Sequence, residues 1–398
     1  MNTHKPHVIL SGNMKDFTFH NPTKLIFGKS AMDKIAENAV EYGKKILVTY
    51  GGGSIKKNGI YEKVMEQLDD FDVKEFGGIE PNPRVETIRK VIEGFRDFDP
   101  DLVLAVGGGS VIDASKLIIS SMHYDGDPWD FMVKSGIAPR KHIPLATVLT
   151  LSATGSEMNK GSVITKWETN EKLPFSRNEN YPKFSILDPQ NTFTVPRDQT
   201  AYGIIDSYSH VLEQYLTNTK DAPLQERLAE SIMLTLIENG QIALDKPNDY
   251  AARANLMFSA TMALNRVISM GVDEDWATHR IEHEISAFYD IPHAAGLAIV
   301  TPRWMEVARH QKKDKFVQYG KRVWGLEGDD EEIVDCTIKE THDFFKSLDV
   351  KMSLKEWNID DEHFDTMTSR LIKLKVGEIP LTGGQIKEIL RNCLTDFV

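Results

Sequence analysis

DLVLAVGGGSVIDASKLIISSM, residues 101–122, is the stretch of the chain that decides the fold. Its first part is a run of small and branched apolar residues that ends in three glycines, and its second part has apolar residues at helical spacing. A strand that is apolar throughout, followed by a glycine turn and a helix, is typical of a parallel sheet that is covered on both faces. We therefore predict an α/β domain built around this unit.

The same succession of strand, turn and helix extends over residues 17–189. KKILVTY, residues 44–50, predicts a buried strand that runs into a second glycine turn. The other elements predicted in this half are helices at 60–68 and 85–95 and strands at 73–76 and 143–150. Such alternation favours a parallel sheet, because parallel strands need a crossover connection.

The glycine turn at residues 107–110 is a candidate phosphate site. Glycines let a ligand approach the backbone, and the following helix directs N–H groups and its positive end at an anion. The GxGxxG fingerprint is absent, so the motif alone is equally compatible with a plain tight turn. The place of the turn in an α/β sheet favours phosphate binding, because such sheets bind ligands where their strands end.

The second glycine turn, Gly51-Gly52-Gly53-Ser54, bears on the choice of dinucleotide. An acidic residue at such a strand end commonly binds the ribose 2′-hydroxyl of NAD and repels a 2′-phosphate. Here glycines and a serine occupy the position, and Lys56 and Lys57 follow. This composition favours NADP(H) over NAD(H).

The pattern changes near Val195 and Pro196. From Thr200 onward strand-like runs are absent, and helical windows lie at 201–216, 223–239, 250–272 and 275–289, with further ones to the end. We predict an α/β dinucleotide-binding domain at residues 14–195 and an all-α domain at 196–398. The residues before Met14 are interpreted as an extension or a cloning remnant.

Composition excludes several classes of protein. The net charge of −12 disfavours nucleic-acid binding. No apolar run reaches the roughly 18 residues of a membrane span. The two cysteines, Cys336 and Cys393, have no metal-binding spacing, which indicates a reducing compartment. We expect a cytoplasmic protein without a nucleic-acid or membrane partner.

The helical half carries five side chains of the kinds that bind metals. Asp206 and His210 are four residues apart, as are His279 and His283, so each pair shares a helix face, and His293 follows Pro292. A mixed Asp/His set suits Fe²⁺, Zn²⁺, Co²⁺ or Ni²⁺. The alternative is that such pairs are surface ion pairs, and spacing alone leaves open which three of the four histidines bind. A metalloprotease fails on spacing, because the stretch reads HRIEH and not HExxH.

Taken together, the motifs resemble the iron-containing (group III) alcohol dehydrogenases, and within them the butanol dehydrogenase-like, NADPH-dependent aldehyde reductase branch. The motifs that carry the resemblance are FHNPTKLIFG, YGGGSIKKNG, EPNP, VGGGSVIDASK, LSATGSEMN, IIDSYSHVLEQYL and DWATHRIEHEISAFYDIPHAAGLAIV. The resemblance implies an α/β domain and a helical domain with the active site in the cleft between them.

The resemblance also implies a role for each site residue. The metal ligands would be Asp206, His210, His279 and His293, and His283 would lie beside the substrate as the catalytic residue. The residues predicted to bind the cofactor are Gly51, Gly52, Ser54, Asn82, Gly108, Gly109, Ser110, Asp113, Thr150, Thr154 and Lys172. Gly52 lies where relatives that use NAD tend to carry an aspartate, in agreement with the preference for NADP(H).

The predicted activity is hydride transfer between NADP(H) and small aliphatic aldehydes or primary alcohols, assisted by one divalent metal, in a homodimer. His283 is predicted to relay a proton with a pKa near the working pH. Trp276, Phe288 and Tyr289 flank the metal motif and predict an apolar pocket. The alternatives are a glycerol- or hydroxy-acid-type dehydrogenase, a metal-dependent phosphohydrolase and a nucleotide-sensing module without activity.

Overall fold

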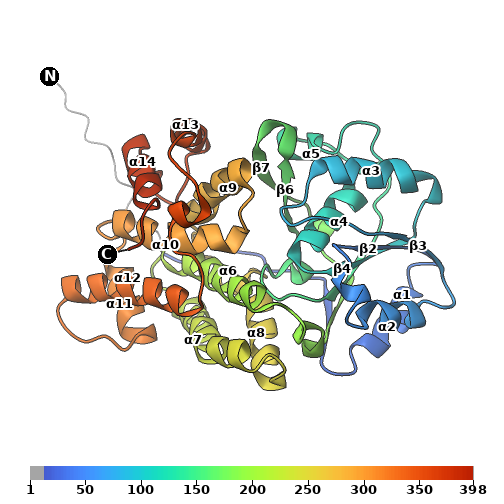
Figure 1. Ribbon diagram of the computed structural model, residues 1–398, viewed down its shortest axis with the longest axis horizontal. Coiled ribbons are helices and arrows are strands. Elements are labelled where there is room, and N and C mark those ends of the chain that lie inside the picture. Colours follow the sequence, from blue (N-terminus) through green and yellow to red (C-terminus); the bar gives the residue numbers. More distant parts are fainter. Residues whose placement is uncertain (1–12, 398) are drawn as a thin grey trace.

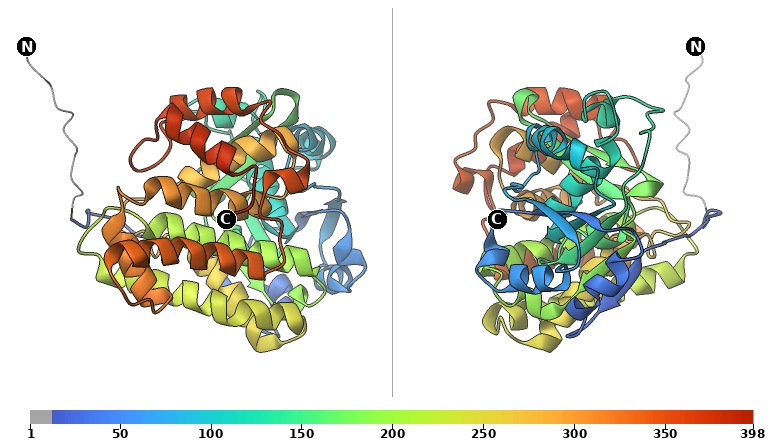
Figure 2. Two further views of the ribbon diagram at one scale, coloured as in Figure 1. Left: turned by 60° about the vertical axis from the view of Figure 1, so that its left-hand side comes forward. Right: turned by 90° about the vertical axis from the view of Figure 1, so that its right-hand side faces the viewer.

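The computed structural model describes residues 13–397, and the interpretation of residues 1–13 as an extension falls almost wholly outside this range. The described chain forms an α/β half and an all-helical half, as predicted (Figure 1). In Figure 2 the helical half faces the viewer in the left view and the α/β half in the right view.

A parallel sheet of six strands, in the order β1-β8-β5-β4-β2-β3, is the centre of the α/β half. Its strands are β1 (Lys24–Phe27), β2 (Lys45–Tyr50), β3 (Asp72–Phe76), β4 (Leu102–Gly107), β5 (Leu145–Leu149) and β8 (Phe184–Leu187). The helices of this half are α1 (Ile35–Ala39), α2 (Ile60–Gln67), α3 (Val85–Phe95), α4 (Gly109–Ser121) and α5 (Asp130–Val133). The strands and helices predicted around the two glycine turns are thereby confirmed.

The sheet is covered on both faces, and its central strand β4 is apolar throughout. In β4 every residue is buried, and alternate residues contribute to two different cores. Val103 packs with residues of α3 and α4, whereas Leu104 packs with residues of α1 and α2. Val103 lies opposite Leu47 of β2 and Leu145 of β5, so the same core continues across the sheet.

The structure has four strands that the sequence pattern did not predict. Two are the short strands β1 and β8. The others, β6 (Gly161–Lys166) and β7 (Glu171–Ser176), form a separate antiparallel hairpin. Their sequences mix polar and apolar residues and include Pro174, so periodicity gave little signal. The hairpin packs against α4 on one side and α9 on the other, which places it between the two halves.

The helical half runs from α6 to the end of the described chain. Its helices are α6 (Arg197–Tyr215), α7 (Pro223–Asp245), α8 (Tyr250–Ala263), α9 (Ala277–Tyr289), α10 (His293–Ala308), α11 (Lys313–Val323), α12 (Asp330–Ser347), α13 (Phe364–Leu374) and α14 (Gly383–Asn392). The helix predicted at 250–272 ends at Ala263, because a turn follows in which Asn265 accepts from the N–H of Val267 and Gly271 has a φ of 73°.

Helix α6 lies directly on the loop that follows β5. Any side chain at Gly203 would overlap the carbonyl oxygen of Ser152, so this close approach requires glycine. Ser207 adds a hydrogen bond of 3.0 Å from its hydroxyl to the carbonyl of Ala153. The sheet end that carries the glycine turns therefore faces the helical half. In the described range no helix combines the length and the hydrophobicity that crossing a membrane requires.

Candidate active site

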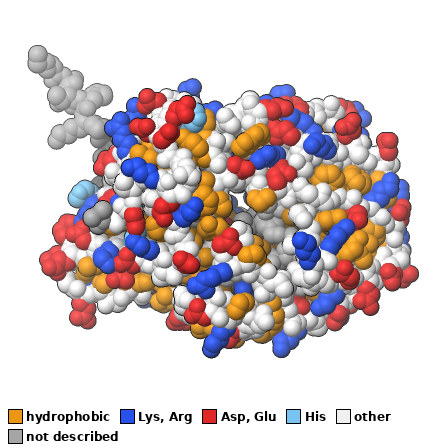
Figure 3. Space-filling model, in the orientation of Figure 1, with side chains coloured by type: hydrophobic (Ala, Val, Ile, Leu, Met, Phe, Trp, Pro, Cys, Tyr) orange, Lys and Arg blue, Asp and Glu red, His pale blue; other side chains and the backbone are white. Residues whose placement is uncertain are grey.

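A cavity of about 470 Å³ lies between the two halves. The face drawn in Figure 3 is hollowed near its middle, and acidic and basic side chains are interspersed around it. Many of the predicted site residues line the cavity, namely Asn82, Gly109, Ser110, Asp113, Thr154, Lys172, Asp206, His210, His279, His283 and His293. The other predicted residues, Gly51, Gly52, Ser54, Gly108 and Thr150, are not among those that line it.

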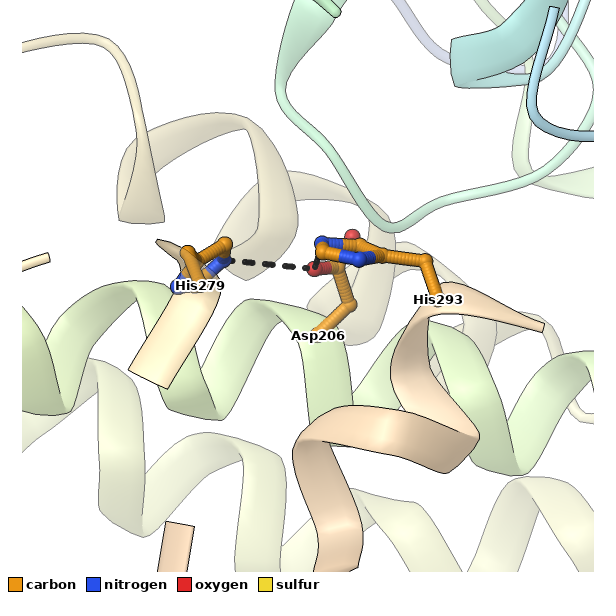
Figure 4. Close-up of side chains that lie close together, drawn as sticks. All are labelled: Asp206, His279 and His293. Atoms are coloured by element: carbon orange, nitrogen blue, oxygen red, sulfur yellow. Dashed lines mark ion pairs between the residues drawn. The ribbon is translucent and has the colours of Figure 1, made fainter. Parts of the chain in front are cut away.

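The predicted metal ligands converge on one carboxylate oxygen. Asp206 comes from the middle of α6, His279 from α9 and His293 from the first turn of α10, and Figure 4 shows both imidazoles turned toward Asp206. Nε2 lies 3.9 Å from Asp206 Oδ1 in His279 and 3.6 Å in His293. His210, one turn after Asp206, has its Nε2 3.6 Å from the same oxygen.

These atoms suit a metal ion. Ligand atoms bound about 2.1 Å from a tetrahedral metal lie about 3.4 Å from one another, close to the separations observed here. One potential ligand atom each from Asp206, His279 and His293 forms a group within 4.8 Å, and His210 lies beside this group. Asp206 Oδ1 and His279 Nε2 are buried without a hydrogen-bond partner in the described chain. Buried polar atoms are rarely left unpaired, so the residues fit a bound cation.

Two buried carboxylates hold two of the predicted histidine ligands in place. Glu213 Oε2 accepts from Nδ1 of His279, and Glu282 Oε2 accepts from Nδ1 of His293. With its proton fixed on Nδ1, each ring directs the lone pair of Nε2 at Asp206. Carboxylates orient metal-binding histidines in this way in many metal sites. Sequence reasoning missed both residues. The available signal was that Glu213 lies three residues after His210 and Glu282 three residues after His279.

Burial keeps His279 and His210 neutral. It lowers the pKa of His279 to about 3 and that of His210 to about 4, against an ordinary value of 6.5. Asp206 raises the pKa of both residues but does not outweigh the loss of solvation. Neutral imidazole is the form that binds a metal.

His283 lies in the same cavity, with its ring 5.5 Å from that of His293 and 6.4 Å from that of His279. Burial, together with Lys172 nearby, lowers its pKa well below the ordinary value. This direction is opposed to the predicted pKa near the working pH, because desolvation disfavours the charged ring. A neutral imidazole still has one donor and one acceptor nitrogen.

The N-terminus of α4 forms the opposite wall of the cavity. A side chain at Gly109 would overlap Thr154, so the glycine allows the two segments to meet. Asp113 is held by protein groups, because Ser156 Oγ donates to it at 2.6 Å and the N–H of Val163 donates at 2.8 Å. Asp113 thus ties the start of α4 to the β6–β7 hairpin.

Lys172, on β7, crosses from the α/β half to the helical half. Its Nζ donates to Asn82 Oδ1 at 3.0 Å and to Ser286 Oγ at 2.7 Å, and lies 3.4 Å from Glu282 Oε2. Asn82 in turn donates to the carbonyl of Ile291 at 3.2 Å. Glu282 therefore joins His293, a predicted metal ligand, to Lys172, a predicted cofactor residue.

The second glycine turn lies outside the cavity lining. A Cβ atom at Gly52 would meet nothing within 4 Å, so the position has room for a side chain. Nζ of Lys56 lies over the rings of Tyr50 and Tyr61 and is 3.4 Å from Glu75. The charge of Lys56 is therefore already matched within the protein.

The aromatic residues near the metal motif divide into two groups. Trp276 lines the cavity, and its ring lies 5.2 Å from that of His279. Phe288 and Tyr289 are not among the lining residues, and Phe288 stacks on His363 at 4.6 Å. The prediction that all three form the pocket is correct only for Trp276, because the end of α9 has turned away from the cavity.

Comparison with known proteins agrees with this architecture. Residues 22–189 match the model of the iron-containing alcohol dehydrogenases, and residues 200–394 match that of the C-terminal part of the Fe-containing alcohol dehydrogenase family. The chain is 45% identical to NADH-dependent butanol dehydrogenase A of Clostridium acetobutylicum, over 95% of this chain and 100% of the relative. It is 42% identical to the NADPH-dependent aldehyde reductase YqhD of Escherichia coli, over 90% and 93%.

A solved structure shows the same fold. The crystal structure of NADH-dependent butanol dehydrogenase A from Thermotoga maritima superposes with a TM-score of 0.93 at 38% identity, and the match covers 96% of this chain and 100% of that one. The resemblance predicted from the motifs is confirmed, which decides against a phosphohydrolase or a nucleotide-sensing module. The chain belongs to the iron-containing alcohol dehydrogenase family of metal- and NAD(P)-dependent oxidoreductases.

Proposed function

We propose that the protein transfers hydride between NADP(H) and small aliphatic aldehydes or primary alcohols, of which butanal and butanol are examples. One divalent metal, Fe²⁺ or Zn²⁺ and alternatively Ni²⁺ or Co²⁺, would be held by Asp206, His210, His279 and His293. The observation that carries the proposal is the convergence of three imidazoles on Asp206 Oδ1 within the cavity that the N-terminus of α4 also lines. The names of the relatives support the substrate class.

The chemistry follows from the groups in the cavity. A metal bound there supplies a Lewis acid that polarises a carbonyl, and the nicotinamide supplies the hydride. Glu213 and Glu282 hold two ligating rings in one tautomer, so the donor atoms need no rearrangement during turnover. Trp276 contributes an apolar surface to the cavity wall for the aliphatic chain.

His283 would move the proton that the product alcohol requires. A neutral ring can give up a proton at one nitrogen while it takes one at the other, so a low pKa does not prevent a relay. Its Nδ1 is buried and has no partner in the described chain.

Replacing His283 with alanine should therefore lower kcat by about 10²- to 10⁴-fold, the usual contribution of general acid–base catalysis. The bound metal should stay stoichiometric in this variant, whereas His293→Ala should lose it. Metal analysis alongside steady-state rates separates the two roles. Loss of the metal from the His283 variant would show that this residue is a ligand.

The preference for NADP(H) rests on the turn after β2. The named relatives are divided, because the clostridial enzyme is called NADH-dependent and the E. coli enzyme NADPH-dependent. In this chain Gly51, Gly52 and Ser54 offer backbone N–H groups and a hydroxyl, and no carboxylate, to a 2′-phosphate. Gly108, Ser110 and Thr150 would bind the remainder of the cofactor, with Lys172 and Asn82 near the nicotinamide.

Gly52→Asp should reverse this preference. A carboxylate about 4 Å from the 2′-phosphate costs about 1–4 kcal/mol at effective dielectric constants of about 80 to 20. At about 1.4 kcal/mol per decade this is roughly a 5-fold to 1,000-fold loss of affinity for NADPH. The quantity to measure is the ratio of kcat/KM for NADPH to that for NADH.

Gly52→Asn is the matched control, because it adds nearly the same volume without the charge. Its ratio should stay close to that of the wild type. An unchanged ratio in Gly52→Asp, or a wild type that strongly prefers NADH, would show that this turn does not face the adenosine ribose.

The proposed activity is tested by the oxidation of NADPH and of NADH against a panel of C2–C6 aldehydes, with glycerol and hydroxy acids as substrates for the reverse reaction. We expect turnover with the aliphatic aldehydes. Oxidation of glycerol with no reduction of butanal would place the protein with the glycerol-type dehydrogenases instead.

Three further predictions accompany this function. The domain division at residues 14–195 and 196–398 is supported by the two family matches, which meet between residues 189 and 200.

The homodimer is checked by sedimentation of the purified protein. The cytoplasmic location is checked by fractionation of cells that produce it.

A further inference from the structure

The cavity contains one charged side chain that forms no direct ion pair or side-chain hydrogen bond in the described chain. Apart from histidines, the charged residues that line it are Asp113, Lys172, Asp206 and Arg280. Asp113 accepts two hydrogen bonds, Lys172 pairs with Glu282, and Asp206 lies among the imidazoles. Within residues 13–397 the guanidinium of Arg280 takes part in no ion pair and no side-chain hydrogen bond, although its backbone N–H donates to Trp276 at 3.1 Å.

Arg280 lies close to the predicted reaction centre. It follows His279 in α9, four residues after Trp276 and three before His283, and all four residues line the cavity. Arg280 and His283, three residues apart, share one face of α9, and Trp276 immediately precedes this helix. Arg280 therefore lines the same wall of the cavity as His279 and Trp276.

A half-buried cation without a partner is unfavourable. Burial lowers the pKa of Arg280 from its ordinary value of 12.5, yet the group remains charged at neutral pH. Charged groups inside proteins are normally paired, because the free-energy cost of removing a charge from water is not compensated unless an opposite charge lies nearby. Butanal has no charge that could pair with the guanidinium. A carboxylate on the substrate would accept two parallel hydrogen bonds from the planar guanidinium group.

We infer that the preferred substrates are short aldehydes with a carboxylate at the far end, that is, oxo acids, and that Arg280 binds this carboxylate. The inference rests on the proposed function and narrows its substrate class. In the reaction the carbonyl carbon gains a hydride from the reduced cofactor, the carbon–oxygen π pair moves to oxygen, and the oxygen gains a proton. The products are the hydroxy acid and the oxidised cofactor, and the carboxylate itself is unchanged.

Two aldehydes of equal length test this directly. 4-Oxobutanoate differs from butanal by a terminal carboxylate in place of a methyl group, so the ratio of their kcat/KM values measures recognition of that charge. We expect the wild type to prefer 4-oxobutanoate. In Arg280→Met this ratio should fall by about 10- to 100-fold, the effect of losing a hydrogen-bonded charge partner.

Arg227→Met is the matched control, because it makes the same chemical change on the exposed surface of α7. Its ratio should equal that of the wild type. Arg280→Lys should keep part of the preference for 4-oxobutanoate, since lysine retains the positive charge but cannot donate two parallel hydrogen bonds. Circular dichroism establishes that each variant is folded, and metal analysis establishes that it contains bound metal.

Calorimetric titration with succinate gives a readout that does not need turnover. Succinate should bind the wild type and the Arg227 variant alike, and should bind Arg280→Met about 10- to 100-fold more weakly.

The other outcomes overturn the inference in distinguishable ways. A wild type that reduces butanal at least as well as 4-oxobutanoate, or a ratio that Arg280→Met leaves unchanged, contradicts carboxylate recognition. A variant whose defect falls on the KM for NADPH would assign Arg280 to a phosphate of the cofactor. A wild type that reduces neither aldehyde would refute the proposed function, and this inference with it.

Discussion

Replacing Asp206 with asparagine is expected to remove most of the activity together with the bound metal. The three imidazole Nε2 atoms surround Asp206 Oδ1 at 3.6–3.9 Å, so this oxygen supplies a negative charge at the centre of the group. Loss of an outer partner of a ligand costs about 10- to 100-fold in metal affinity, and loss of an anionic ligand should cost more. Metal content and kcat should therefore fall in parallel.

Asp198→Asn is the control for this experiment. Asp198 lies on the same helix, α6, but in its exposed first turn. If the residues of the group merely formed ion pairs on helix faces, both variants would show a small change in stability and nearly normal rates. Full metal content and wild-type turnover in Asp206→Asn would contradict the metal site.

The second large effect is expected at Glu282. This carboxylate accepts from His293 and pairs with Lys172, and the ion pair is almost fully buried on both sides. Burial would raise the pKa of Glu282, but His293 and Lys172 outweigh it and lower the pKa, so the group is ionised. Glu282→Gln keeps the shape and leaves the charge of Lys172 without a partner.

We expect this variant to lose about 3–5 kcal/mol of unfolding free energy, the usual result of removing one member of a buried ion pair. Its metal affinity should fall by about 10- to 100-fold, because His293 loses the group that orients it. Urea unfolding and metal titration measure the two effects separately.

Glu284→Gln is the matched comparison, two residues further along α9. Glu284 pairs with Arg370 at 3.3 Å, and within residues 13–397 it forms no ion pair or hydrogen bond with a predicted metal ligand. The Glu284→Gln variant should lose some unfolding free energy but keep the bound metal. Wild-type metal affinity in Glu282→Gln would refute the role assigned to this carboxylate.

The sequence was sufficient to predict the parts of the fold that follow from local pattern. The apolar run at residues 102–106, followed by three glycines, predicts a buried strand, and the turn after it leaves no room for a side chain at Gly107 or Gly109. The β6–β7 hairpin was missed because its strands contain polar residues and are stabilised by packing against α4 and α9. Such contacts between distant segments leave no periodic signal.

In the candidate site, too, contacts within one helix were predictable from the sequence, whereas contacts between distant residues were not. Helical spacing placed Asp206 with His210, whereas the contact of Glu213 with His279 joins residues 66 positions apart. Adjacency in sequence was misleading for Phe288 and Tyr289, since α9 turns them away from the cavity that Trp276 lines. The direction of a side chain depends on how its helix packs.

The central claim is that catalysis needs one metal ion held by the Asp206 group. The most direct test is to strip the protein of metal, add Fe²⁺ or Zn²⁺ in steps, and follow the oxidation of NADPH with butanal after each addition. The rate should be negligible at first, rise linearly, and become constant at one ion per chain. A metal-free protein that turns over at the full rate, or a rate that added ions do not change, would contradict the claim.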